Sequence, residues 1–110
     1  MSQLTTHVLD TTLGRPAAGV PVTLAAFVAG EWTVLATGAT DDDGRARSLG
    51  PDTVPPGRYR FVFDTATYFA ATGHVGFHPE VVVVFEVVDD GHYHVPLLLS
   101  PFAYSTYRGS

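Results

Sequence analysis

The chain contains no cysteine in its 110 residues. Disulfide bonds and thiolate metal sites are therefore excluded, and the fold has to be held together by side-chain packing. Positive charge is also scarce, because the six basic residues are all arginine and eleven Asp and Glu give a formal net charge of −5. A nucleic-acid surface needs clustered Lys and Arg, so we expect no nucleic-acid partner.

Long apolar segments and targeting signals are absent as well. No stretch approaches the ~18 consecutive apolar residues that mark a membrane-spanning helix. The first residues, Met1-Ser2-Gln3, lead directly into a strand pattern, without the basic and apolar regions of a signal peptide. We therefore expect a cytoplasmic protein that does not associate with a membrane.

Several common catalytic motifs do not occur. The sequence has no Gly-rich phosphate loop, no Gly-x-Ser-x-Gly turn and no His-Glu-x-x-His. These absences remove the usual signatures of nucleotide-binding proteins, serine hydrolases and metalloproteases. The acidic run Asp41-Asp42-Asp43-Gly44 does not fit an EF-hand loop either, because two of the required oxygen ligands would be missing.

The residues that are present suffice for one packed core, since 45% are hydrophobic and 12% aromatic. The length is typical of a single domain, so we expect one domain spanning residues 1–110. Short runs rich in Val, Thr, Phe and Tyr, separated by Gly, Pro and Asp clusters, predict strands. These runs cover residues 4–10, 20–28, 32–40, 59–64, 81–88 and 93–99.

Turn and helix signals complete the expected architecture. Residues 29–31 (Ala-Gly-Glu) and 89–91 (Asp-Asp-Gly) are typical of hairpin turns. Residues 65–72 favour a two-turn helix, with Thr65 as a possible cap and Gly73 just past the end. The pattern predicts an all-β fold, a two-sheet sandwich with one short helix.

Histidines lie on two of the predicted strands. Because successive side chains of a strand point to opposite faces, His7 shares a face with Thr5. In the last strand, His92 and His94 share a mixed face, and the opposite face is apolar (Tyr93, Val95, Leu97 and Leu99). A mixed face indicates a site or an interface, although such histidines are also common as surface residues. Pro96 is expected to mark a bend after His94 or a sheet edge.

Arg45 follows the acidic turn at residues 41–44. Its Asp-Gly pair predicts a hairpin that delivers Arg45 to the start of the next strand. The guanidinium is either an ordinary solvated charge or a fork directed at a planar oxyanion. Arg47 lies on the same strand face and competes for that role.

A metal site is a further interpretation of the histidines. His92 and His94 on one face are compatible with zinc or copper if His7 joins them. A matched acidic ligand is lacking, and we expect no metal. His74 and His78 follow the predicted helix, and the sequence assigns them no function.

Three motifs, in order, resemble one known family. The first is Leu4-Thr-Thr-His-Val-Leu-Asp10 followed by Gly14-Arg-Pro-Ala17, the second is Asp41-Asp-Asp-Gly-Arg45, and the third is Tyr107-Arg-Gly-Ser110. Together they span nearly the whole chain and resemble the transthyretin-like 5-hydroxyisourate hydrolases. In that family a Tyr-Arg-Gly-Ser end separates the enzymes from the hormone-carrying transthyretins.

The resemblance implies a transthyretin-like sandwich that hydrolyses 5-hydroxyisourate to 2-oxo-4-hydroxy-4-carboxy-5-ureidoimidazoline in urate catabolism. It implies a small-molecule substrate, no cofactor, and a homotetramer with sites in a channel between two dimers. The implied catalytic residues are His7, Arg45, His94 and Ser110. The implied substrate-binding residues are His7, Arg45, Tyr107 and Arg108. Arg45 is preferred to Arg47 because the arginine of the family directly follows Asp-Gly.

Two other classes of function stay open at this point. A carrier of planar aromatic ligands, as in the true transthyretins, would use the same channel without turnover. A sugar- or peptide-binding sandwich module would be expected to have companion domains, and the 110-residue sequence shows none.

Overall fold

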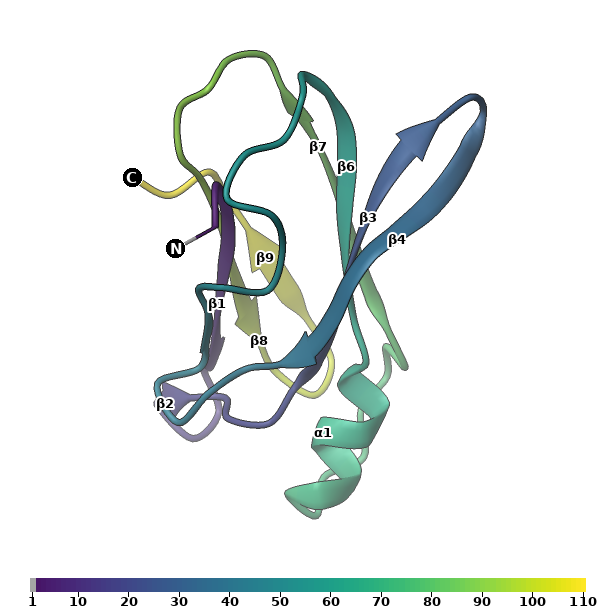
Figure 1. The fold of residues 1–110 in the computed structure, drawn as a ribbon. Coiled ribbons are helices and arrows are strands. Elements are labelled where there is room, and N and C mark those ends of the chain that lie inside the picture. Colours follow the sequence, from purple (N-terminus) through teal and green to yellow (C-terminus); the bar gives the residue numbers. More distant parts are fainter. Residues whose placement is uncertain (1) are drawn as a thin grey trace.

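The computed structural model describes residues 2–110, which form two β-sheets packed face to face, with one short helix at one end (Figure 1). The first sheet contains β1 (Leu4–Asp10), β2 (Arg15–Pro16), β5 (Arg45–Ala46), β8 (Tyr93–Leu99) and β9 (Tyr104–Thr106). The second sheet contains β3 (Pro21–Val28), β4 (Glu31–Ala39), β6 (Gly57–Phe63) and β7 (Val81–Val87). Helix α1 (Thr65–Ala71) follows β6. The predicted all-β sandwich with one short helix is confirmed.

The six long strands predicted from composition are all present, with ends shifted by no more than two residues. Strands β2, β5 and β9 were not predicted. They have only two or three residues, too few for an alternating pattern, and each exists because it pairs with β1 or β8.

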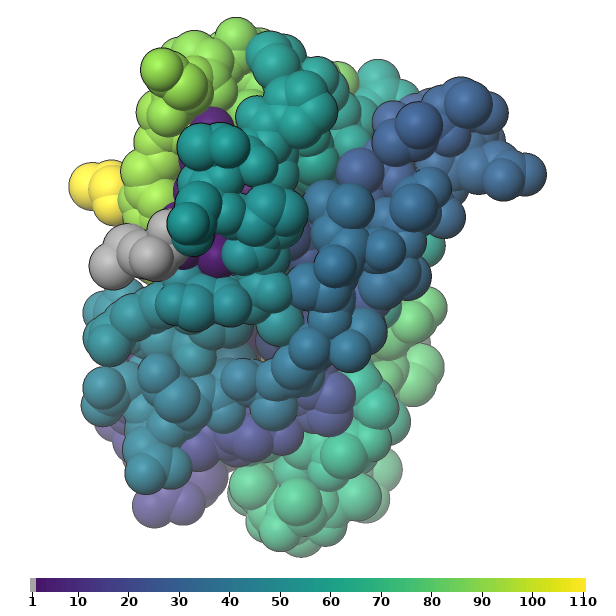
Figure 2. Space-filling model, in the orientation of Figure 1, coloured from purple at the N-terminus to yellow at the C-terminus, as the bar shows by residue number. Residues whose placement is uncertain are grey.

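The two predicted hairpin turns have different outcomes. Residues Ala29 and Gly30 both have positive φ angles and join β3 to β4, which confirms the first hairpin. That hairpin projects from one corner of the molecule (Figure 2). The prediction for residues 89–91 is wrong, because β7 belongs to the second sheet and β8 to the first. The segment is a crossing between the sheets, and the Asp89 side chain accepts a bond from Gly91 N within it.

The turn at residues 41–44 is present, but it also crosses between the sheets. It follows β4 of the second sheet and precedes β5, which pairs with β1 in the first. The turn is closed by a bond from Asp41 N to the Arg45 carbonyl (2.9 Å), and Gly44 has a φ of 75°. The Asp-Gly pair therefore correctly predicted the turn and the position of Arg45 at the start of the next strand. The prediction that the two flanking strands form a hairpin was wrong.

The N-cap of helix α1 lies one residue earlier than predicted. Asp64, not Thr65, is the N-cap, and its carboxylate accepts bonds from the backbone N–H and the hydroxyl of Thr67. The Thr65 side chain is buried and donates its hydroxyl to the His78 carbonyl instead. Gly73 follows the helix with a φ of 73°, as expected. No helix within residues 2–110 is long and apolar enough to cross a membrane.

The core lies between the two sheets. The predicted apolar face of β8 is buried there, and the largest fully buried side chains come from both sheets (Phe61, Phe63, Leu4, Leu24, Leu97 and Leu99). Helix α1 is tied to the end of β1 by a buried bond of 2.7 Å from the Tyr68 hydroxyl to Asp10 Oδ2. Burial, and then this bond to a carboxylate, raises the pKa of Tyr68.

Strand β1 lies in the middle of the first sheet and brings distant segments together. On one edge it pairs in parallel with β8, so that Thr5 lies beside His94. On the other edge it pairs antiparallel with β5, so that His7 lies beside Arg45. These pairings bring residues from three separate parts of the sequence together in this sheet, in which β1, β8 and β9 lie side by side (Figure 1).

Candidate active site

Most of the predicted site residues gather on the outer face of the first sheet. The rings of His7 and His94 have centroids 6.5 Å apart, and both side chains are half-buried. Beside them is a hollow of about 160 Å³, lined by Thr5, Thr6, Arg45, Arg47, His92, His94 and Ser110. The structure thus brings His94, Arg45 and Ser110 to one hollow, with His7 adjacent through its pairing with Arg45.

Thr5 connects His94 of β8 with His92, the residue just before that strand. Its Oγ1 lies 2.8 Å from His94 Nδ1 and 2.9 Å from His92 Nε2. The Thr5 side chain is almost fully buried, with 3% of its surface exposed. One hydroxyl therefore fixes the orientation of both imidazoles.

The charges of the site favour neutral imidazoles. Burial lowers the pKa of His94 below its ordinary value of 6.5, and the nearby Arg45, His92 and His7 lower it further. Burial and Arg45 also lower the pKa of His7, although Asp43 and Asp41 partly oppose them. Neutral imidazoles next to a fixed guanidinium can accept a proton and stabilise a developing anion at neutral pH.

The chain after β9 returns to the sheet at Gly109. This residue forms a bridge with His94, and its N–H donates to the His94 carbonyl at 2.8 Å. A Cβ atom at Gly109 would lie 2.6 Å from His94 Cδ2 and 3.2 Å from Pro96 Cγ. Only glycine allows the tail to pack this closely against the His94 ring.

Pro96 shapes the path of the tail. Strand β8 keeps one register with β1 on both sides of Pro96, so the proline does not break the strand. Pro96 instead limits the pairing of β8 with β9. The ladder between these strands ends at the pair Leu97 and Thr106, next to Pro96. Pro96 has no N–H to donate, and its carbonyl accepts the Thr106 hydroxyl at 2.7 Å. The residues that follow Thr106 are therefore free of a regular ladder until Gly109.

The structure places Tyr107 and Arg108 apart from the hollow. The Arg108 guanidinium lies 4.3 Å above the ring of Tyr93, a core residue. Tyr107 is 57% exposed, and with Arg108 it borders a second hollow of about 230 Å³ between β7 and the tail, which His94 also lines. Of the four tail residues, Gly109 contacts His94, Ser110 lines the hollow beside it, and Arg108 is held by Tyr93.

Arg47 also lines the hollow, so location alone does not separate it from Arg45. Two observations favour Arg45. It is in register with His7, and its charge lowers the pKa of both His7 and His94. The guanidinium of Arg47 instead lies 3.9 Å from the Asp43 carboxylate, in an exposed ion pair.

The metal interpretation has no matching geometry. The ring centroids of His92 and His94 are 6.2 Å apart, and those of His7 and His94 are 6.5 Å apart. Within residues 2–110, no group of three His, Cys, Asp or Glu side chains is arranged to hold a metal ion. His78, one of the two histidines without an assigned role, packs edge-on against Phe77 and Tyr104.

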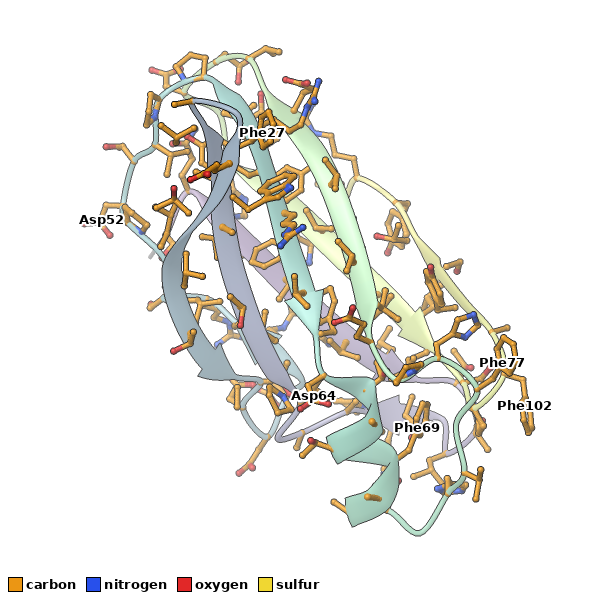
Figure 3. All side chains as sticks on the ribbon, turned by 90° about the vertical axis from the view of Figure 1, so that its right-hand side faces the viewer. Phe27, Asp52, Asp64, Phe69, Phe77 and Phe102 are labelled. Carbon is orange, nitrogen blue, oxygen red and sulfur yellow. The ribbon has the colours of Figure 1, made fainter. Side chains whose placement is uncertain are left out.

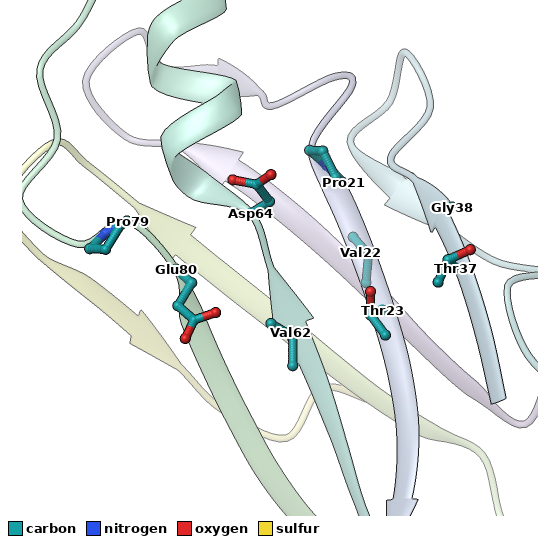
Figure 4. Close-up of a pocket in the computed structure, with 9 residues that line it drawn as sticks. All are labelled: Pro21, Val22, Thr23, Thr37, Gly38, Val62, Asp64, Pro79 and Glu80. Carbon is teal, nitrogen blue, oxygen red and sulfur yellow. The ribbon is translucent and has the colours of Figure 1, made fainter. Parts of the chain in front are cut away.

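A larger hollow, of about 420 Å³, lies on the second sheet near the start of α1 (Figure 4). Its lining contains none of the predicted site residues, and its two carboxylates are Asp64 and Glu80. Asp64 is already occupied as the helix cap. The histidines and the arginine that the sequence predicts for a site are all on the first sheet.

Sequence reasoning missed Thr5. The alternation of strand faces placed it on the same side as His7, but the contact with His94 depends on the parallel pairing of β1 with β8. Alternation does not reveal which strand is the neighbour, so no signal in the sequence identified this contact.

The two-sheet sandwich with one short helix places this chain in the class of transthyretin-like proteins. Residues 4–109 match the HIUase/Transthyretin family. The 5-hydroxyisourate hydrolase of Salmonella dublin is 48% identical over 109 residues, covering 97% of this chain and 80% of the relative. The chain therefore belongs to the HIUase/transthyretin family.

Solved structures of both branches of the family are similar to this chain. The 5-hydroxyisourate hydrolase of Klebsiella pneumoniae has a TM-score of 0.88 at 37% identity, covering 100% of both chains. Sea bream transthyretin in complex with thyroxine has a TM-score of 0.92 at 39% identity, covering 97% of this chain and 94% of the other. Because both branches share the fold, the fold alone does not separate an enzyme from a carrier.

Proposed function

We propose that this protein hydrolyses 5-hydroxyisourate to 2-oxo-4-hydroxy-4-carboxy-5-ureidoimidazoline. The observation that carries the proposal is the meeting of His7, His94 and Arg45 on one face, with two imidazoles whose pKa is lowered. A ligand carrier has no need of such bases. The similarity to proteins named 5-hydroxyisourate hydrolase supports the choice of substrate.

The reaction opens a cyclic amide with water. The water oxygen adds to the ring carbonyl carbon while its proton passes to an imidazole of the His7 and His94 pair. The carbonyl oxygen becomes an oxyanion, and Arg45 stabilises it with a fixed charge. When the carbonyl re-forms, the carbon–nitrogen bond breaks and the leaving nitrogen takes the proton back from the imidazolium. The water is consumed and no cofactor takes part.

The tail completes the proposed site. Ser110 lines the hollow, and we assign it a hydrogen bond to the substrate or to the leaving nitrogen. The exposed phenol of Tyr107 contributes a second hydrogen bond once substrate is bound. Arg108 holds the tail through its contact with Tyr93, and it borders the second hollow with Tyr107 and His94, from which it would contact the substrate.

The proposal includes a homotetramer. Large aromatic side chains near the β8–β9 turn are exposed in the single chain: Phe77 and Phe102 are both 72% exposed, and Tyr104 is also exposed. Figure 3 shows Phe77 and Phe102 together at one corner of the molecule. Exposed aromatic groups of this kind are typical of surfaces that bind other chains. Sedimentation analysis that finds a monomer at micromolar concentration would contradict this part.

The decay of freshly prepared 5-hydroxyisourate, followed by ultraviolet absorbance with and without the protein, tests the activity. We expect the protein to accelerate the decay, and a variant lacking residues 107–110 to lose the acceleration while remaining folded. Tight binding of a planar ligand such as thyroxine without any acceleration would instead favour a carrier. Normal turnover in the variant lacking residues 107–110 would show that the tail takes no part in the reaction.

A further inference from the structure

The Thr5 hydroxyl lies between two imidazole nitrogens, His94 Nδ1 at 2.8 Å and His92 Nε2 at 2.9 Å. A hydroxyl has one proton to donate and two lone pairs that accept. It can therefore donate to only one of the two rings, and at least one ring nitrogen must carry a hydrogen and donate to Thr5. The tautomers of His92 and His94 are coupled through this single oxygen.

The direction of the Thr5 proton decides what His94 can do. If Thr5 donates to His92 Nε2, His94 Nδ1 must carry the hydrogen, and His94 Nε2 keeps a free lone pair. If Thr5 donates to His94, the hydrogen sits on His94 Nε2, and that nitrogen cannot accept a proton from water. His94 is therefore a base at Nε2 only when its Nδ1 carries the hydrogen and donates to Thr5, and a Thr5 hydroxyl that donates to His92 enforces this arrangement.

We infer that Thr5, oriented by His92, is a positioning residue that holds His94 as the Nδ1–H tautomer. The inference rests on the proposed hydrolysis, in which His94 takes part in proton transfer. It gives a role to His92, which forms no metal-binding group of three with His7 and His94 in residues 2–110.

The surroundings of the ring support this assignment. The parallel pairing of β1 with β8 puts Thr5 directly beside His94, so the hydroxyl is fixed by the backbone of two strands. On the opposite side of the ring, Cδ2 packs against Gly109. No hydrogen bond among residues 2–110 involves His94 Nε2. The ring is thus held at Nδ1 and Cδ2, and Nε2 is left for the substrate water.

Nitrogen-15 NMR of the imidazoles in the intact protein at neutral pH tests the tautomer directly. We expect the His94 resonances to show a protonated Nδ1 and an unprotonated Nε2. The reverse pattern would overturn the inference. This measurement needs neither turnover nor a variant, so it separates a failure of the inference from a failure of the proposed function, which would appear as an inactive wild type.

Variants test the consequence for the reaction. Thr5→Val keeps the volume and removes the hydroxyl, and we expect kcat to fall roughly three- to tenfold with little change in KM, the usual effect of one hydrogen bond on an equilibrium. Thr5→Ser should restore kcat, and His92→Ala should resemble Thr5→Val. Thr23→Val, on the second sheet, is the matched control and should leave kcat unchanged. A Thr5→Val variant with normal kcat, or a Thr5→Ser variant equally impaired, would overturn the inference.

Discussion

Replacing Gly109 by alanine should disable the site without unfolding the protein. The added Cβ would lie 2.6 Å from His94 Cδ2, whereas ordinary contacts begin at 3.4 Å, so the ring or the tail must move by about 0.8 Å. The ring cannot turn away freely, because its Nδ1 is bonded to Thr5 at 2.8 Å. Moving the tail would break the bond from Gly109 N to the His94 carbonyl. Either movement displaces a group of the proposed site.

A misplacement of about 1 Å in a catalytic group can cost on the order of 10²-fold in rate. We therefore expect kcat/KM of Gly109→Ala to fall about a hundredfold, or ~2.7 kcal/mol in the activation free energy. The decay of 5-hydroxyisourate measures the rate, and thermal unfolding at a fixed protein concentration measures the stability. The unfolding temperature should change little, because Gly109 lies outside the core.

The matched control is Gly50→Ala. Its Cβ would lie 2.6 Å from Leu24 Cδ2, a contact as close as the one at Gly109, but made with a flexible methyl group of a β3 side chain. Its activity should equal that of the wild type. A Gly109→Ala variant within threefold of wild-type kcat/KM would refute the reasoning, and so would an equal loss in both variants.

Three other outcomes follow from the contacts of the site and the core. His7→Ala and His94→Ala should each lose on the order of 10²–10⁴-fold in kcat while remaining folded, and a loss below about threefold would reject the role of that histidine. Arg45→Gln should lose on the order of 10²–10³-fold in kcat. The Arg45 charge lowers the pKa of both histidines from 6.5, so its removal should raise both pKa values. The acidic limb of the pH profile of kcat/KM should then move to higher pH. An acidic limb that stays in place or moves to lower pH would contradict the role of the Arg45 charge. Tyr68→Phe removes the donor to the buried Asp10 carboxylate and should lower the free energy of unfolding by about 1.5–3 kcal/mol in urea titrations, with kcat unchanged.

Composition predicted the long strands well, because alternation and β-branched residues are local signals. It did not predict which strands are neighbours. The segment at residues 89–91 has the composition of a turn, but that composition does not tell whether the strands on either side join one sheet or two. The cap at Thr65 failed for a similar reason, because its hydroxyl is used by a carbonyl thirteen residues away.

In the candidate site, too, local sequence patterns predicted some residues, whereas contacts between distant segments were not predictable. The alternation of strand faces marked His7 and His94 as candidates, and the family resemblance assigned them and Arg45 a catalytic role. Thr5 was not recognisable, because its importance comes from a strand 89 residues away. The position of Arg108 was not predictable either, because the tail has no alternating pattern and the Tyr93 ring that holds it belongs to the core.

The parallel pairing of β1 with β8 also has a consequence for how the chain acquires its structure. The four strands of the second sheet lie within residues 21–87 and pair only with one another, so that sheet can form before β8 exists. Strand β1 must wait for residues 93–99, and contacts of such long sequence separation form slowly. During synthesis at about 5–20 residues per second, the first strand made is among the last to find its neighbour. Early in folding, a spectroscopic signal from β-structure is therefore expected to report mainly the second sheet, whereas the contact between Thr5 and His94 is expected to form late.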